Sequence, residues 1–146
     1  MMNMNLRDLY KIAFSFRKAI KEAIASEDIS EVNLKKFPDG CCIYASDLLQ
    51  RYLFENEINT LFMSGSYGYG WEGEKHAWLE TYDGIVIDIT GDQFKNKKPK
   101  FTKSVYVGLR DDGFHDRFKL DKPLAYKVKN ELKFNERYDA VMRHMK

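Results

Sequence analysis

Hydrophobic residues recur with two different periods along this chain, and the change between them falls near residue 57. In residues 5–26, and again from residue 42 to about residue 56, apolar positions return every three or four residues, which predicts amphipathic helices. Residues 130–145 repeat that spacing and predict a closing helix. Between residues 60 and 107, short apolar runs bounded by turn residues predict strands. This order predicts an α+β fold, in which the helix of residues 42–56 packs on an antiparallel β-sheet of three to five strands.

A β-hairpin is predicted within the strand region. Residues 76–80 alternate like a strand, and residues 85–90 read as the return strand. Asp83-Gly84 marks the turn between them. If the loop consists of residues 82–84, with Gly84 in the left-handed conformation, the residues on either side of the loop pair with each other.

The length of this loop decides whether His76 and Asp88 share a face of the sheet. Pairing of Thr81 with Ile85 places Trp78 opposite Asp88. His76 is then the diagonal neighbour of Asp88 on the same face, about 7–8 Å away. A two-residue loop would instead put the two side chains on opposite faces, because a register shift of one residue moves every side chain of a strand to the other face of the sheet.

A cysteine in the first turn of the second predicted helix is a candidate nucleophile. Gly40 interrupts the preceding segment, and the helical pattern begins at once with Cys42. The unpaired N–H groups and the positive dipole end of a helix stabilise a thiolate at that position. With His76 as base and Asp88 as orienting carboxylate, the chain offers a triad in the order Cys, His, Asp.

These motifs together resemble the transglutaminase-like branch of the papain-like cysteine protease superfamily. The segments that carry the resemblance are Phe37-Pro38-x-Gly40-x-Cys42, the His76-Ala-Trp-Leu-Glu80 strand and Ile87-Asp88-Ile-Thr-x-Asp-Gln-Phe94, and the pattern is similar to a bacterial subgroup. It covers about residues 34–94 of a chain that we expect to form one transglutaminase-like domain over residues 1–146. Many relatives carry Trp after the cysteine and Pro after the aspartate, where this chain has Ile43 and Ile89.

The resemblance implies a cysteine-dependent amide hydrolase, a peptidase or amidase that forms a thioester intermediate. The register of the relatives favours Cys42 over Cys41 as nucleophile, with His76 taking its proton and Asp88 fixing the tautomer. The oxyanion would be bound by the Cys42 backbone N–H and, as a candidate, by the side chain of Gln93. Gln93 is equally explained as a residue that ties down a loop.

Three alternatives to hydrolysis stay open. One is a function without the cysteine, in which the glycine- and aromatic-rich segment of residues 65–73 presents a protein-interaction surface. An acyl transferase of the transglutaminase type would use the same residues, and a non-catalytic module would bind a peptide in the same cleft. The glycine- and aromatic-rich segment of residues 65–73 is either a simple connection or a loop that covers substrate. Tyr67, Trp71 and Trp78 are therefore candidate substrate contacts, although each is also explained as core or lid.

The composition of the chain argues against some other classes of function. Of the 146 residues, 44% are hydrophobic and the formal net charge is +2, so we expect a packed core and neither a nucleic-acid nor a membrane partner. We find no apolar run of about 18 residues and no secretory signal, and the adjacent cysteines are expected to be reduced thiols in a cytoplasmic protein. The basic run of residues 95–100 is expected to be a solvated loop. The expected partner is a peptide or small amide substrate, a protein partner is left open, and no cofactor or metal is expected.

The chain contains two further histidines, and neither is expected to serve as the base. His115 lies in the carboxylate-rich segment of residues 111–116, which predicts a charged turn rather than a metal site because recognised ligand spacing is missing. His144 lies at the end of the closing helix. Neither is followed by a carboxylate paired on the same strand face, so both are predicted to be dispensable for the reactivity of Cys42.

Overall fold

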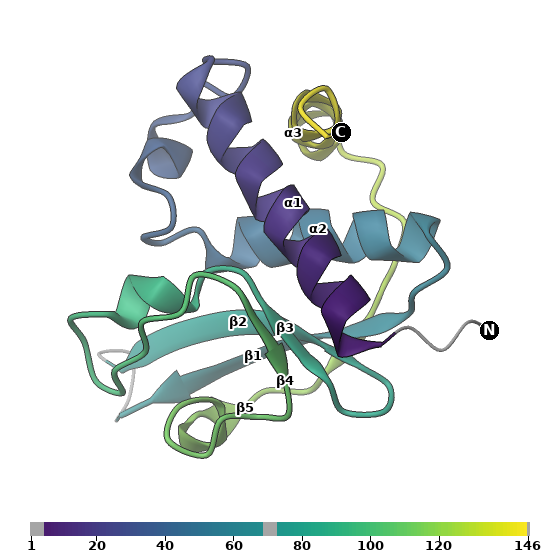
Figure 1. Ribbon diagram of the computed structural model, residues 1–146. Helices are drawn as coiled ribbons and strands as arrows, with labels where there is room; N and C mark the ends of the chain where they lie inside the picture. Colours follow the sequence, from purple (N-terminus) through teal and green to yellow (C-terminus); the bar gives the residue numbers. More distant parts are fainter. Residues whose placement is uncertain (1–4, 69–72, 146) are drawn as a thin grey trace.

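The computed structural model describes residues 5–68 and 73–145, and this part of the chain forms an α+β fold (Figure 1). It contains three α-helices and one antiparallel sheet of six strands. The α-helices are α1 (Leu6–Ala25), α2 (Cys42–Glu55) and α3 (Leu132–Met142). Short 3-10 helices are η1 (Val32–Lys36), η3 (Gly91–Phe94) and η4 (His115–Arg117). None of the described helices is long and apolar enough to cross a membrane.

The sheet has the strand order β4-β3-β2-β1-β5, with β6 also paired to β1. Its strands are β1 (Thr60–Tyr67), β2 (Glu74–Thr81), β3 (Val86–Asp88), β4 (Tyr106–Gly108), β5 (Lys119–Leu120) and β6 (Leu124–Ala125). The α+β class and the antiparallel sheet are confirmed, but the expected range of three to five strands is wrong among the described residues. β5 and β6, which lie beyond the predicted strand region of residues 60–107, have two residues each, too few to show a period of two in the sequence.

The predicted hairpin register is confirmed. Glu80 pairs with Val86 in the ladder, and Thr81 N–H donates to the Ile85 carbonyl at 2.8 Å. Gly84 has φ of 90°, a left-handed value that glycine adopts without steric cost, and this closes the three-residue loop. The same register carries Asp88 onto the face of the sheet that holds Trp78 and His76.

The two faces of the sheet bury different kinds of side chain. The face toward α1, α2 and α3 is mainly aliphatic and includes Leu79 and Ile87. The opposite face carries a second cluster, rich in aromatic residues, with Trp78 at its centre and Phe94, Phe101, Phe114 and Phe118 around it. His76 and Asp88 belong to this second, aromatic face.

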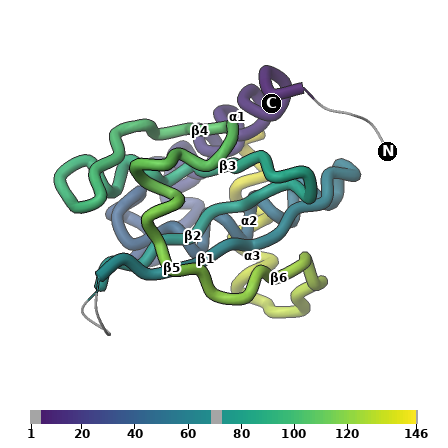
Figure 2. The backbone as a smooth tube through the Cα atoms, turned by 90° about the horizontal axis from the view of Figure 1, so that it is seen from below, coloured from purple at the N-terminus to yellow at the C-terminus, as the bar shows by residue number. Residues whose placement is uncertain are grey.

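The connection from β4 to β5 explains how the aromatic face is covered. β4 is at one edge of the sheet, whereas β5 pairs with β1 on the far side of β2 and β3. The chain between them must therefore cross the face of the sheet, and Figure 2, which is seen from this side, shows it passing in front of the strands. It carries η4 and brings Phe114, His115 and Phe118 against the site from below.

Candidate active site

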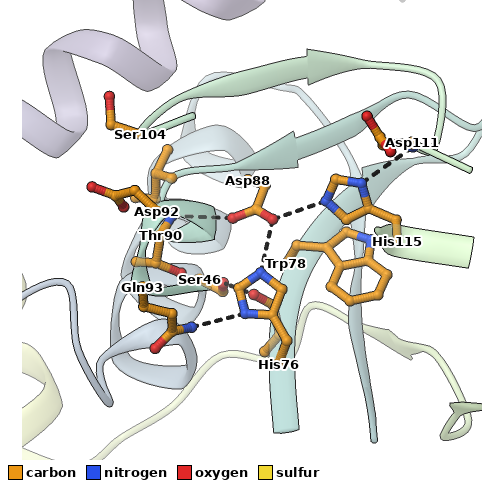
Figure 3. Close-up of polar contacts among 12 residues, drawn as sticks. Ser46, His76, Trp78, Asp88, Thr90, Asp92, Gln93, Ser104, Asp111 and His115 are labelled. Atoms are coloured by element: carbon orange, nitrogen blue, oxygen red, sulfur yellow. Dashed lines mark hydrogen bonds and ion pairs between the residues drawn. The ribbon is translucent and has the colours of Figure 1, made fainter. Parts of the chain in front are cut away.

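His76 and Asp88 form a buried hydrogen-bonded pair (Figure 3). His76 Nε2 lies 2.8 Å from Asp88 Oδ2, and each residue is 1% exposed. The other carboxylate oxygen accepts the backbone N–H of Thr90 at 3.0 Å. Because an ionised carboxylate only accepts hydrogen bonds, the proton between the two groups lies on His76 Nε2, and Nδ1 faces the rest of the site.

Cys42 reaches this pair from the start of α2. The imidazole of His76, the side-chain amide of Gln93 and the backbone of Ala77 lie near enough to its thiol to lower the pKa of Cys42. One turn further along α2, Ser46 Oγ donates to the Ala77 carbonyl at 3.4 Å, which holds the helix against β2. Cys42 is 9% exposed, more than either His76 or Asp88, so it is the residue of the three that lies nearest to solvent.

Gln93 is oriented by a contact with the segment that precedes α2. The backbone N–H of Gly40 donates to Gln93 Oε1 at 3.1 Å, so the amide nitrogen must point the other way, and it lies 2.9 Å from His76 Nδ1. Gly40 has φ of 69°, a left-handed conformation that directs its N–H toward η3. Gln93 donates to His76 Nδ1 in the neutral form of the imidazole, because a protonated Nδ1 accepts no hydrogen bond. Its N–H groups also lie near Cys42 and lower the pKa of that thiol.

A buried arginine holds η3 in place. Arg17 on α1 donates to both carboxylate oxygens of Asp92, at 3.0 and 2.9 Å, and to the Ile89 carbonyl at 2.6 Å. Its guanidinium also lies over the ring of Phe37, 5.0 Å from the centroid. One side chain thus links α1 to the residue before Gln93 and to the segment before Cys42.

The electrostatics favour a thiolate beside an imidazolium. Burial by itself lowers the pKa of His76, but the Asp88 carboxylate outweighs it and raises the pKa of His76 to about 9. Burial likewise raises the pKa of Cys42, yet the hydrogen bond and charge of His76, with Gln93 and Ala77, lower it overall. Asp88 stays ionised because its two histidine neighbours outweigh burial and hold its pKa below the ordinary value.

Cys41 has the opposite character. Its Sγ donates to the backbone carbonyls of Asn33 and Asp39, at 3.5 and 3.3 Å. Burial, together with the negative charge of Cys42 and of Asp39, raises the pKa of Cys41 to about 11. Cys41 is therefore a protonated thiol at neutral pH, and Cys42 is the nucleophilic candidate of the two.

His115 is a member of the site that the sequence reading missed. The predicted charged turn is present, since His115 begins η4, but the ring is fully buried, with Nε2 at 2.9 Å from Asp88 Oδ2. The β4–β5 crossing brings it there from 27 residues away. Phe114 and Phe118 flank it in the sequence, and these aromatic neighbours are the local signal of burial that could have found it. By contrast, His144 binds Asp28 at the far end of α1, 2.7 Å away.

The three candidate substrate contacts have different outcomes. Trp78 is fully buried, and its indole N–H donates to Glu80 Oε2 at 3.0 Å, so it packs against the imidazoles and does not form an exposed cleft wall. Tyr67 ends β1 half-buried, with the Arg117 guanidinium 5.6 Å from its ring centroid. Trp71 lies outside the described residues.

Comparisons of the chain with protein-family models, curated proteins and solved structures found no match. Within residues 5–68 and 73–145, no group of three or more His, Cys, Asp or Glu side chains is arranged to hold a metal ion. The chemistry of the site is therefore inferred from its own geometry.

Proposed function

We propose that this chain is a cysteine-dependent amide hydrolase with a papain-like arrangement of its catalytic groups. The observation that carries the proposal is the buried relay from Cys42 through His76 to Asp88, in which the pKa of the thiol is lowered and the pKa of the imidazole is raised. A thiolate paired with an imidazolium is the reactive form of a cysteine nucleophile at neutral pH.

In the first half of the reaction, the Cys42 thiolate adds to the carbonyl carbon of an amide, and the carbonyl oxygen takes the negative charge. Gln93 and the Cys42 backbone N–H, which belongs to the first turn of α2 and has no intrahelical acceptor, donate to this oxygen. The C–N bond then breaks as His76 gives its Nδ1 proton to the leaving nitrogen. An amine leaves, and the acyl group remains on sulfur as a thioester.

In the second half, water resolves the thioester. His76 Nδ1 takes one proton from the water as its oxygen adds to the acyl carbon, and the C–S bond breaks. The products are a carboxylic acid and the restored thiolate–imidazolium pair. Asp88 keeps its negative charge throughout and holds His76 in the tautomer that leaves Nδ1 toward Cys42.

The test combines labelling with turnover. Iodoacetamide at pH 6, followed by fragmentation mass spectrometry, should modify Cys42 and leave Cys41 free. Incubation with a mixture of glutamine-containing peptides and a primary amine then separates the reactions. Cleaved or deamidated peptides indicate hydrolysis, and amine adducts indicate acyl transfer.

Hydrolysis that is absent from the Cys42→Ala variant supports the proposal. If amine adducts dominate, the proposed hydrolase would have to be replaced by an acyl transferase that uses the same residues and the same thioester. Hydrolysis that persists in Cys42→Ala would refute it. A reactive Cys42 without either product, or an unreactive one with peptide binding retained, would favour the non-catalytic peptide-binding module.

A further inference from the structure

Asp88 accepts hydrogen bonds from two buried imidazoles. Oδ2 lies 2.8 Å from His76 Nε2 and 2.9 Å from His115 Nε2, while Oδ1 accepts the Thr90 N–H at 3.0 Å. Figure 3 shows the two rings reaching the same carboxylate from different sides. A triad needs one imidazole on its carboxylate, so the second one calls for an explanation.

The protonation of His115 follows from its other ring nitrogen. The backbone N–H of Asp111 donates to His115 Nδ1 at 3.3 Å, so Nδ1 carries no proton. The single ring proton is therefore on Nε2 and is donated to Asp88. Aromatic rings enclose the imidazole and hold its plane: Trp78, Phe101, Tyr106 and Phe114.

We propose that His115 is a positioning residue that moderates the charge of Asp88 and so sets how readily His76 releases its proton. The inference rests on the proposed function, because that proton is the one His76 gives to the leaving nitrogen. Each N–H donated to a carboxylate weakens the attraction between that carboxylate and a neighbouring imidazolium. Without the His115 N–H, Asp88 would act on His76 alone, and His76 would hold its proton more firmly.

The other charges around the pair are arranged in two layers. Cys42 on α2, Asp88 on β3 and His115 at η4 face His76 directly. Beyond them are ion pairs whose charges offset each other: Glu80 with Arg110 behind Trp78, and Asp92 with Arg17 behind Gln93. Asp111 and Asp116 flank His115 along the chain. A neutral replacement of His115 therefore changes the donor on Asp88 without removing a formal charge.

The experiment measures the rate constant of Cys42 alkylation from pH 4 to pH 10 in the full chain. The rate changes twice, once when the thiol ionises beside the imidazolium and once when the imidazolium loses its proton. His115→Met removes the donor, and His115→Gln keeps an N–H on a side chain of similar length. We expect the upper transition of His115→Met to move to higher pH by about 0.5–1 unit, and that of His115→Gln to stay near the wild type.

An upper transition in His115→Met that coincides with the wild type, moves to lower pH, or moves equally in His115→Gln would overturn the inference. His144→Gln is the matched control, since it changes a histidine bound to Asp28 at the other end of the fold. A wild-type Cys42 that is no more reactive than Cys41 would instead count against the proposed function.

A measurement on the wild-type chain covers the case in which the variants do not fold or the thiol does not react. Nitrogen-15 NMR of the imidazole rings at pH 7 should find His115 protonated at Nε2 and bare at Nδ1. A proton on Nδ1 of His115 would overturn the inference. The Asp111 N–H could then not donate to Nδ1, and the argument that places the single ring proton on Nε2, facing Asp88, would fail.

Discussion

Cys41 and Cys42 are consecutive residues at the start of α2, but their sulfur atoms face two different regions of the molecule. The region around Cys41 offers carbonyl oxygens, from Asn33 and Asp39. The region around Cys42 offers N–H donors, and among them the imidazole of His76 lowers the pKa of Cys42 most. Carbonyl oxygens stabilise an S–H group, and N–H donors stabilise a thiolate.

The comparison separates the effect of the helix from the effect of its surroundings. Both residues stand at the N-terminus of α2, Cys41 as N-cap and Cys42 as first helical residue, so the helix dipole acts on both. Burial disfavours the thiolate in both. Nevertheless the pKa of Cys41 rises to about 11, while the pKa of Cys42 falls below its ordinary value. The direction of the side chain, more than the position on the helix, therefore sets the opposite pKa shifts of the two thiols.

The largest expected effect comes from exchanging the two thiols separately for alanine. Cys42→Ala should lower kcat/KM for amide hydrolysis by about 10⁴-fold or more, because the nucleophile is lost. Cys41→Ala should change kcat/KM little and cost roughly 1–2 kcal/mol of stability, since it only leaves a small gap in the core. Steady-state kinetics and thermal melts on both variants test this. Equal losses of activity would erase the distinction between the two regions.

Replacing His76 by alanine should make Cys42 behave like an ordinary thiol. At pH 6.5, an unassisted thiol is about 1% ionised, so the alkylation rate should fall about 10²-fold. The raised pKa of His76 and the lowered pKa of Cys42 both favour the ion pair, and the imidazolium is lost as pH rises through about 9. The wild-type rate at pH 6.5 is the reference, and unchanged labelling there would show that another group activates the thiol.

Removing the side-chain amide of Gln93 should affect turnover more than labelling. Gln93→Ala is expected to lower kcat about 10²-fold, because a donor to the oxyanion is lost, while alkylation forms no oxyanion. Asn96→Ala, an exposed amide on the following loop, is the matched control. If kcat of Gln93→Ala stays near the wild type, Gln93 serves to tie η3 to Gly40 and has no part in the chemistry.

The smallest effect is expected at the contact that aims Cys42 toward β2. Ser46→Ala removes the hydrogen bond to the Ala77 carbonyl and should lower the free energy of unfolding by about 1 kcal/mol. Ser15→Ala, at an exposed position of α1, is the reference for the loss of a hydroxyl alone. Denaturant unfolding of the two variants measures the difference, and equal stability would mean that other contacts dock the helix.

Local pattern was enough to predict the pieces of the site that depend on short-range geometry. The spacing of apolar residues predicted the helix that begins at Cys42. The turn at Gly84 predicted the register that puts His76 and Asp88 on one face, because a three-residue loop leaves one pairing for the strands that it joins. Gln93 was a candidate from its motif, although the contact with Gly40 that orients it could not be read from the sequence.

Other expectations failed where a side chain's surroundings come from distant segments. His115 was predicted to lie in a charged turn without a paired carboxylate, yet it is buried against Asp88. That it is dispensable for the reactivity of Cys42 stays a prediction. Trp78 was a candidate cleft wall or a core residue, and it is fully enclosed. Both outcomes have one cause: the β4–β5 connection crosses the aromatic face of the sheet, and a two-residue strand pairing with β1 leaves no periodic signal of that crossing.

The sequence by itself determined the helices, the hairpin and the order of cysteine, histidine and aspartate, because each depends on residues close together in the chain. Only the tertiary structure decided which cysteine meets donors and which meets carbonyls, and that Asp88 serves two imidazoles. These outcomes depend on where β2, η3 and η4 come together around the start of α2. A pKa responds to the atoms that surround a group within a few ångströms, and here those atoms come from segments that lie far apart in the chain.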